Sequence, residues 1–208
     1  MAAANENQWR ELWQRLDAHG DALPPWQQLQ TAYTESWRTY HNLDHIGHCL
    51  DEFAAVRQVA DNPIAIEAAI WFHDVIYDTR AKDNEERSAE FAAAVLRDTG
   101  KSASFCDSVH TLILATRHQS QPTSTDARLL TDIDLSILGQ SPERYAEFER
   151  QIRREYAWVA DQDFATGRSA ILAGFLQRES IYNSPAFIQR YEKQARVNLT
   201  WAIKELAA

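Results

Sequence analysis

The sequence predicts an all-α protein, and two observations indicate this fold class. Most of the chain consists of segments with helical periodicity, and no segment has the alternating pattern of a strand ladder. The six glycines and six prolines are sparse and fall between the periodic segments, where helix ends are expected. The chain has 208 residues, a length that suits one domain. We therefore expect a single helical bundle over residues 1–208.

Ten helices are expected along the chain. Their boundaries follow the ends of the periodic segments, and the ranges are 6–19, 27–38, 40–60, 63–78, 84–99, 102–118, 125–139, 142–160, 162–178 and 184–206. The connecting stretches 23–25, 79–83 and 120–126 are expected to be short loops of one compact domain.

Capping residues support several of these boundaries. Three pairs place a capping residue before a proline at the first helical position: Asn62-Pro63, Ser141-Pro142 and Ser184-Pro185. Asp83 or Asn84 can cap the helix expected at 84–99. Gly100 and Gly139 lie where the C-terminal caps of two other helices are expected.

Composition excludes some classes of function and favours others. A formal net charge of -9 argues against binding to a nucleic-acid polymer, which needs clustered Lys and Arg. An anionic substrate would need local positive charge, from a metal ion or from inward-facing arginines. No apolar run reaches membrane-spanning length, and no signal stretch opens the chain. The two cysteines, Cys49 and Cys106, suit a reducing compartment, so a cytoplasmic protein without a membrane partner is expected.

The pair His73-Asp74 stands inside the most apolar of the predicted helices. The run that surrounds it is Ala68-Ala69-Ile70-Trp71-Phe72-His73-Asp74-Val75-Ile76-Tyr77. Burying an imidazole and a carboxylate there is costly unless both find partners. A metal ion would satisfy both side chains, so the pair indicates a candidate metal site. A core histidine followed by an acid at a helix end is the structural alternative.

Two further segments could complete such a site. His41 and His45 are four residues apart, so in the predicted helix 40–60 they share a face and can point into one cavity. Asp132 and Asp134 lie in the apolar segment that follows Leu130. They project to nearly opposite sides, and composition alone does not choose between them. Mixed His and Asp ligands suit Mn, Fe, Co, Ni, Zn or Mg, and such an ion supports metal-assisted hydrolysis.

The ordered set of these segments resembles the HD-domain superfamily of metal-dependent phosphohydrolases. The resemblance covers nearly the whole chain and is strongest to the bacterial group described as predicted HD-superfamily phosphohydrolases. The segments that carry it are Tyr40-His41-Asn42-Leu43-Asp44-His45, Trp71-Phe72-His73-Asp74, Asp83-Asn84-Glu85-Glu86-Arg87-Ser88 and Asp132-Ile133-Asp134-Leu135-Ser136. The resemblance implies an HD-domain-like helical bundle that binds a divalent metal ion.

A more distant resemblance, to the cyclic-nucleotide phosphodiesterases, implies particular roles. They share a Tyr-His-Asn-x-x-His segment, a His-Asp pair and an Asp-Leu-Ser segment in this order. Carried over, His41 is the general acid, and the metal ligands are His45, His73, Asp74 and Asp134. The phosphodiesterases have a further histidine after the His-Asp pair, where this chain has Val75-Ile76-Tyr77-Asp78. This departure favours one metal ion over two, although a second is left open.

Three other residues are candidates for supporting roles. Asp78 could hold or activate the attacking water or hydrogen-bond a ligand histidine, or it could be a solvated acid at a helix end. Arg38 precedes the histidine segment and could bind a substrate phosphate. His118, near the end of the helix expected at 102–118, could bind a phosphate or a second metal ion. Glu85 is a weaker candidate for positioning water, since helix capping explains most of its segment.

The expected function is hydrolysis of a phosphate ester of a nucleotide or a small phosphorylated metabolite. Three alternatives stay open: a phosphodiesterase acting on a cyclic or linear nucleotide, an iron-dependent oxygenase on a related helical fold, and a non-catalytic nucleotide-binding sensor. The expected partner is a small phosphorylated substrate, and the chain could form a homodimer.

Overall fold

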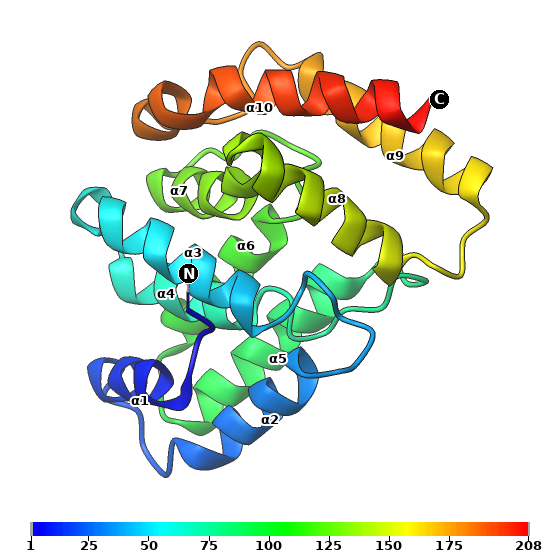
Figure 1. Ribbon diagram of the computed structural model, residues 1–208. Coiled ribbons are helices and arrows are strands. Elements are labelled where there is room, and N and C mark those ends of the chain that lie inside the picture. Colours follow the sequence, from blue (N-terminus) through cyan, green and yellow to red (C-terminus); the bar gives the residue numbers. More distant parts are fainter. Residues whose placement is uncertain (1, 208) are drawn as a thin grey trace. The chain divides into compact units, whose positions relative to one another are not determined.

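The computed structural model describes residues 2–207, and within this range the protein is all-α, as predicted (Figure 1). The described residues form ten α-helices and two 3-10 helices and include no strand. Contacts between Cα atoms divide the chain into two compact units, the first ending at Ile133 and the second beginning at Asp134. The expectation of a single HD-type domain over 1–208 stays a prediction.

The first unit is built around one buried helix. Its α-helices are α1 (Glu6–Arg15), α2 (Leu23–Tyr33), α3 (Leu43–Val56), α4 (Pro63–Phe72), α5 (Asn84–Asp98), α6 (Ala103–Ala115) and α7 (Thr125–Asp134), and the 3-10 helix η1 (Arg57–Val59) follows α3. Helix α4 packs against α1, α3, α5 and α6 (Figure 1). Every residue of α4 from Ala65 to Phe72 is buried, which fits a helix that is apolar on nearly all sides.

The second unit is built around the long C-terminal helix. It contains η2 (Leu135–Gly139), α8 (Pro142–Glu155), α9 (Asp161–Leu176) and α10 (Pro185–Leu206), and α10 packs against the other three. The Asn198 side chain donates hydrogen bonds to the carbonyls of Leu138 (2.8 Å) and Gln140 (2.9 Å). Gly139 lies so close to Tyr191 that a Cβ at this position would come within 2.5 Å of the tyrosine Cβ. The glycine therefore serves close packing as well as ending η2.

Most predicted helix starts agree with the structure. The Asn62 side chain accepts a hydrogen bond from the Ala65 amide, and the Ser141 side chain accepts one from the Arg144 amide. Ser184 also precedes the first residue of α10, but its side chain makes no capping bond. Gly100 has a φ of +83° directly after the C-cap of α5, as expected of a C-terminal glycine.

The prediction of a loop at 23–25 is wrong, because α2 begins at Leu23. Pro24 and Pro25 occupy the first turn of this helix. A proline costs little there, since the first amides of a helix have no partner within the helix. The proline pair therefore starts the helix that it was expected to precede.

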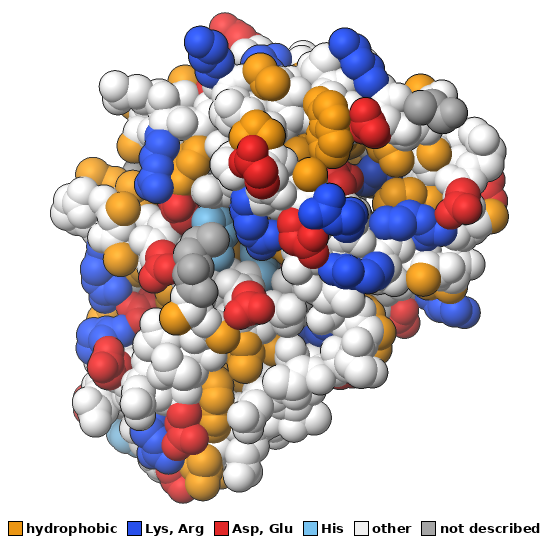
Figure 2. All heavy atoms as spheres, viewed as in Figure 1, with side chains coloured by type: hydrophobic (Ala, Val, Ile, Leu, Met, Phe, Trp, Pro, Cys, Tyr) orange, Lys and Arg blue, Asp and Glu red, His pale blue; other side chains and the backbone are white. Residues whose placement is uncertain are grey.

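Charged side chains of both signs are mixed on the face of the molecule seen in Figure 2. In the second unit many of the arginines have acidic partners: Arg150 and Arg154 pair with Glu147, Arg153 with Asp161, Arg168 with Glu149 and Arg196 with Glu192. These pairs use three arginines of α8, one of α9 and one of α10. Among the described residues, no helix has the length and apolar character needed to cross a membrane.

Replacing Trp9 with alanine is expected to destabilise the first unit by about 3–5 kcal/mol. The Trp9 ring is fully buried and contacts the rings of Trp13, Trp71 and Phe72 at centroid distances of 5.5, 5.6 and 5.7 Å. Its Nε1–H also donates a hydrogen bond to the Ala22 carbonyl (2.9 Å). Urea denaturation followed by circular dichroism measures this loss.

The matched control is Val59→Ala, because Val59 is 52% exposed and its truncation opens no cavity. This control is expected to change the free energy of unfolding by less than about 0.5 kcal/mol. A loss of similar size in both variants would contradict the central packing role of Trp9.

Candidate metal centre

Three side chains of the first unit converge at the end of α4. His45 comes from the first turn of α3, His73 is the C-cap residue of α4, and Asp74 follows it. The two imidazole Nε2 atoms lie 3.1 Å apart. The Asp74 Oδ2 atom lies 3.0 Å from Nε2 of His73 and 3.6 Å from Nε2 of His45. Two nitrogen donors and one oxygen donor thus face a common point.

The spacing of these atoms fits a shared metal ion. Ligand nitrogens and oxygens lie about 2.0–2.2 Å from a metal such as zinc, which puts neighbouring ligand atoms about 3.0–3.5 Å apart. Both histidines are buried, and the Asp74 side chain is only 16% exposed. The group could therefore hold a metal ion, as His45, His73 and Asp74 were expected to do.

The orientation of His73 is set by a main-chain carbonyl. Its Nδ1 lies 2.9 Å from the carbonyl oxygen of Ile70, one turn earlier on α4. When Nδ1–H donates to this carbonyl, Nε2 of the neutral ring carries the lone pair that a metal ion requires. The end of the helix thus fixes both the direction and the tautomer of this donor.

The predicted helix 63–78 is wrong at its C-terminal end, because α4 ends at Phe72. One tertiary bond and one local turn bond take the carbonyls that a longer helix would use. The Trp71 carbonyl accepts a hydrogen bond from the Tyr33 hydroxyl (2.9 Å), and the Phe72 carbonyl accepts one from the Val75 amide (3.1 Å). Asp74 therefore lies in a turn, and not on the helix as the sequence had suggested.

The segment after the turn is also held in place. The Ser88 hydroxyl of α5 bonds both the amide and the carbonyl of Ile76, each at 3.1 Å. This serine is fully buried. It anchors residues that follow Asp74 and limits the freedom of the turn that carries the carboxylate.

Electrostatics around Asp74 favour the ionised carboxylate. Burial is the largest single influence and by itself would raise the pKa of Asp74. The imidazoles of His73, His41 and His45 act in the opposite direction, and together they hold the pKa of this carboxyl well below its usual range. A negatively charged oxygen at this position is the form that binds a cation.

His41 lies beside the group but not on the helix that was predicted to carry it. Helix α3 begins at Leu43, because the Asn42 side chain caps it by accepting hydrogen bonds from the amides of Asp44 and His45. The prediction that His41 and His45 share a helix face is therefore wrong. The ring of His41 nevertheless lies 5.9 Å from that of His45 and 4.0 Å from that of Tyr77, measured between centroids. Its role as an acid stays a prediction.

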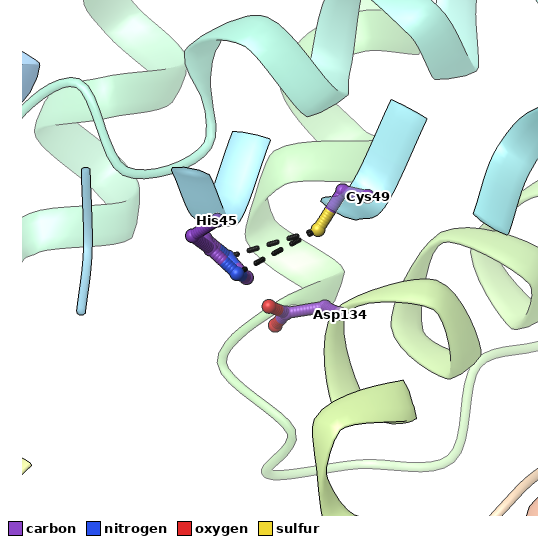
Figure 3. A group of neighbouring side chains, drawn as sticks. All are labelled: His45, Cys49 and Asp134. Carbon is purple, nitrogen blue, oxygen red and sulfur yellow. Dashed lines mark hydrogen bonds between the residues drawn. The ribbon is translucent and has the colours of Figure 1, made fainter. Parts of the chain in front are cut away.

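Cys49 is a neighbour of His45 that the sequence analysis did not include in the site. Its sulfur lies 3.7 Å from Nε2 and 3.8 Å from Nδ1 of His45, one turn away on α3 (Figure 3). The four-residue spacing was the available signal. Cys49 is also buried.

Asp132 and Asp134 lie on either side of Ile133, the last residue of the first unit. Asp134 is the last residue of α7 and the first residue of the second unit, and Figure 3 draws it with His45 and Cys49. Its role as a ligand stays a prediction. Asp132 is fully buried two residues earlier.

The three remaining candidates lie in or beside loops. Asp78 is exposed, and its Oδ1 atom accepts a hydrogen bond from the Arg80 amide (2.9 Å), which stabilises the turn that they form. His118 lies beyond the end of α6 with a φ of +56°. Arg38 is buried and donates hydrogen bonds to main-chain carbonyls. The predicted roles of Asp78 in catalysis and of Arg38 and His118 in substrate binding stay predictions.

The fold and the site together define a class: an all-α protein with a buried His and Asp group that could hold a metal ion. No family model, curated protein or solved structure matches the chain.

Proposed function

We propose that this protein is a metal-dependent phosphohydrolase of the HD superfamily that cleaves a phosphate ester of a nucleotide or small phosphorylated metabolite. The observation that carries the proposal is the convergence of His45, His73 and Asp74 at 3.0–3.6 Å, with His41 beside them. The order of these residues along the chain is that of the superfamily's motifs.

The proposed metal ligands are His45, His73, Asp74 and Asp134. A divalent ion held by these side chains would supply Lewis-acid chemistry, namely polarisation of a phosphoryl oxygen and a lowered pKa for a bound water. The group offers nitrogen and oxygen donors, a set that Mn, Fe, Co, Ni and Zn accept and that Mg accepts less readily. The buried His45 and His73 also keep bulk water away from one side of the site.

His41 is the proposed general acid. It donates a proton to the leaving oxygen as the bond between phosphorus and that oxygen breaks. Contacts with Tyr40 and Tyr77, at centroid distances of 4.9 and 4.0 Å, restrict the motion of its ring. An acid whose ring has little freedom, and which lies next to the metal ligands, is suited to protonate the leaving group of a phosphate bound at the ion.

Removal of the metal is expected to abolish phosphate release. Protein purified without a chelating tag is analysed for its metals and then assayed against nucleotides and sugar phosphates. Treatment with a chelator should stop the reaction, and addition of one of the divalent ions should restore it, because the nucleophile depends on the ion.

Full phosphate release by protein without bound metal would contradict the proposal. Tight nucleotide binding without phosphate release from any substrate would instead favour a sensor. Release of a nucleoside monophosphate from a cyclic nucleotide, without free phosphate, would favour a phosphodiesterase.

A further inference from the structure

Arg38 is a buried arginine with an unusual set of partners. Its side chain is only 2% exposed. Nη1 donates a hydrogen bond to the carbonyl of Asp74 (2.5 Å), and Nη2 donates one to the carbonyl of Val75 (3.0 Å). Nε donates to the Glu35 carboxylate (2.8 Å). The guanidinium therefore faces the main chain of the turn that follows α4.

The location explains why a charged group is stable there. The last carbonyls of a helix lack partners within the helix, and the C-terminal end of the helix carries partial negative charge. Arg38 supplies positive charge just beyond the end of α4. The rings of Tyr33, Trp37 and Tyr77 surround it, with centroids 5.4–5.7 Å from its central carbon. Carbonyls, a carboxylate and aromatic faces thus replace the water that the guanidinium loses on burial.

The same arginine also reaches the segment that carries His41. Nη1 lies 3.5 Å from the His41 carbonyl, a long hydrogen bond. Tyr77 contacts both the guanidinium and the His41 ring. Arg38 therefore joins the loop before α3 to the turn after α4, and these two segments carry His41 and Asp74.

We propose that Arg38 is a positioning residue of the metal centre, holding the Asp74 main chain so that its carboxylate faces His45 and His73. The inference rests on the proposed function, because it assumes that these three residues bind a metal ion. It differs from the expected contact between Arg38 and a substrate phosphate. A phosphate would be bound by Nη1 and Nη2 of Arg38 together. These two atoms instead donate to the carbonyls of Asp74 and Val75.

The test is the affinity of Arg38→Lys for Mn²⁺, measured by isothermal titration calorimetry. Lysine keeps the charge but lacks the planar guanidinium whose two terminal nitrogens donate to two carbonyls at once. Loss of such an outer partner of a ligand typically weakens metal binding about ten- to a hundredfold. We expect a loss in that range, with KM for the substrate unchanged at saturating Mn²⁺. Circular dichroism establishes that the variant is folded at the temperature of the titration.

The matched control is Arg57→Lys. Arg57 is only partly buried and donates a hydrogen bond to Glu67 of α4 (2.6 Å), but it contacts no residue of the candidate centre among its described partners. Its affinity for Mn²⁺ should equal that of the wild type. A second variant, Glu35→Gln, disturbs Arg38 without removing it and should also weaken Mn²⁺ binding. It replaces Arg38→Lys as the test if Arg38→Lys does not fold.

The outcomes separate this inference from the proposed function. If folded Arg38→Lys binds Mn²⁺ with wild-type affinity, the positioning role is overturned and the proposed function stands. The same holds for Glu35→Gln if only that variant folds. A raised KM with unchanged Mn²⁺ affinity also overturns it and assigns Arg38 to the phosphate. Failure of the wild-type protein to bind any divalent ion overturns the proposed function first.

Discussion

Replacing His73 with alanine is expected to abolish metal binding and phosphate release together. Its Nε2 atom lies 3.1 Å from Nε2 of His45 and 3.0 Å from Oδ2 of Asp74, so it is the donor closest to both of the others. Loss of a direct ligand should exceed the ten- to hundredfold loss of affinity that is typical of an outer partner. Elemental analysis and a phosphate-release assay of the same preparation measure both effects.

His110→Ala is the matched control for this variant. His110 is a half-buried histidine of α6, in the same unit, and it is not part of the group that could hold a metal. It should retain wild-type metal content and activity. Because His73 also bonds the Ile70 carbonyl, thermal denaturation is measured for both variants. A folded His73→Ala protein that keeps its metal would exclude His73 as a ligand.

Local signals in the sequence were sufficient for most helix starts. Asn62 and Ser141 cap α4 and α8 through bonds to residues three positions later, and such a bond depends only on the local sequence. Asn42 gives the same kind of signal for α3, because its side chain accepts hydrogen bonds from the next turn. Reading Asn42 as a cap would have placed His41 before the helix.

The end of α4 could not be predicted in this way. The chain between Pro63 and Asp83 contains no glycine or second proline to end the helix, and apolar residues resume at Val75, directly after His73-Asp74. The partners that shape the turn are Tyr33, Arg38 and Ser88, which lie on other elements. Only the tertiary structure brings these groups to the end of α4.

The sequence predicted part of the candidate site, and the reasons for choosing its residues differed in strength. The need of His73 and Asp74 for a partner followed from the apolar residues around them, whereas the choice of His45 followed from the resemblance. The structure brings these three residues together. Cys49 was missed because a buried cysteine usually acts as a small apolar residue. Asp134 was preferred to Asp132 by resemblance alone, and it stays a predicted ligand.

Replacing His41 with glutamine is expected to lower kcat while the metal remains bound. The His41 ring lies 5.9 Å from that of His45, and its segment precedes the helix that carries this ligand. A general acid typically contributes about a hundred- to ten-thousandfold to a rate, so a loss of this size is expected. Steady-state kinetics and metal analysis of the same protein measure kcat and metal content. His19→Gln, a change of an exposed histidine, should alter neither.

The leaving group distinguishes an acid from a residue that only shapes the pocket. An alkoxide is a poor leaving group and needs a proton as the bond breaks, whereas a nitrophenolate leaves readily without one. His41→Gln should therefore lose much more activity toward an alkyl phosphate than toward a nitrophenyl phosphate. Equal losses for both substrates would show that His41 acts on the shape of the site. A loss of metal in this variant would instead place His41 among the groups that hold the ion, and the proton would then have to come from another residue.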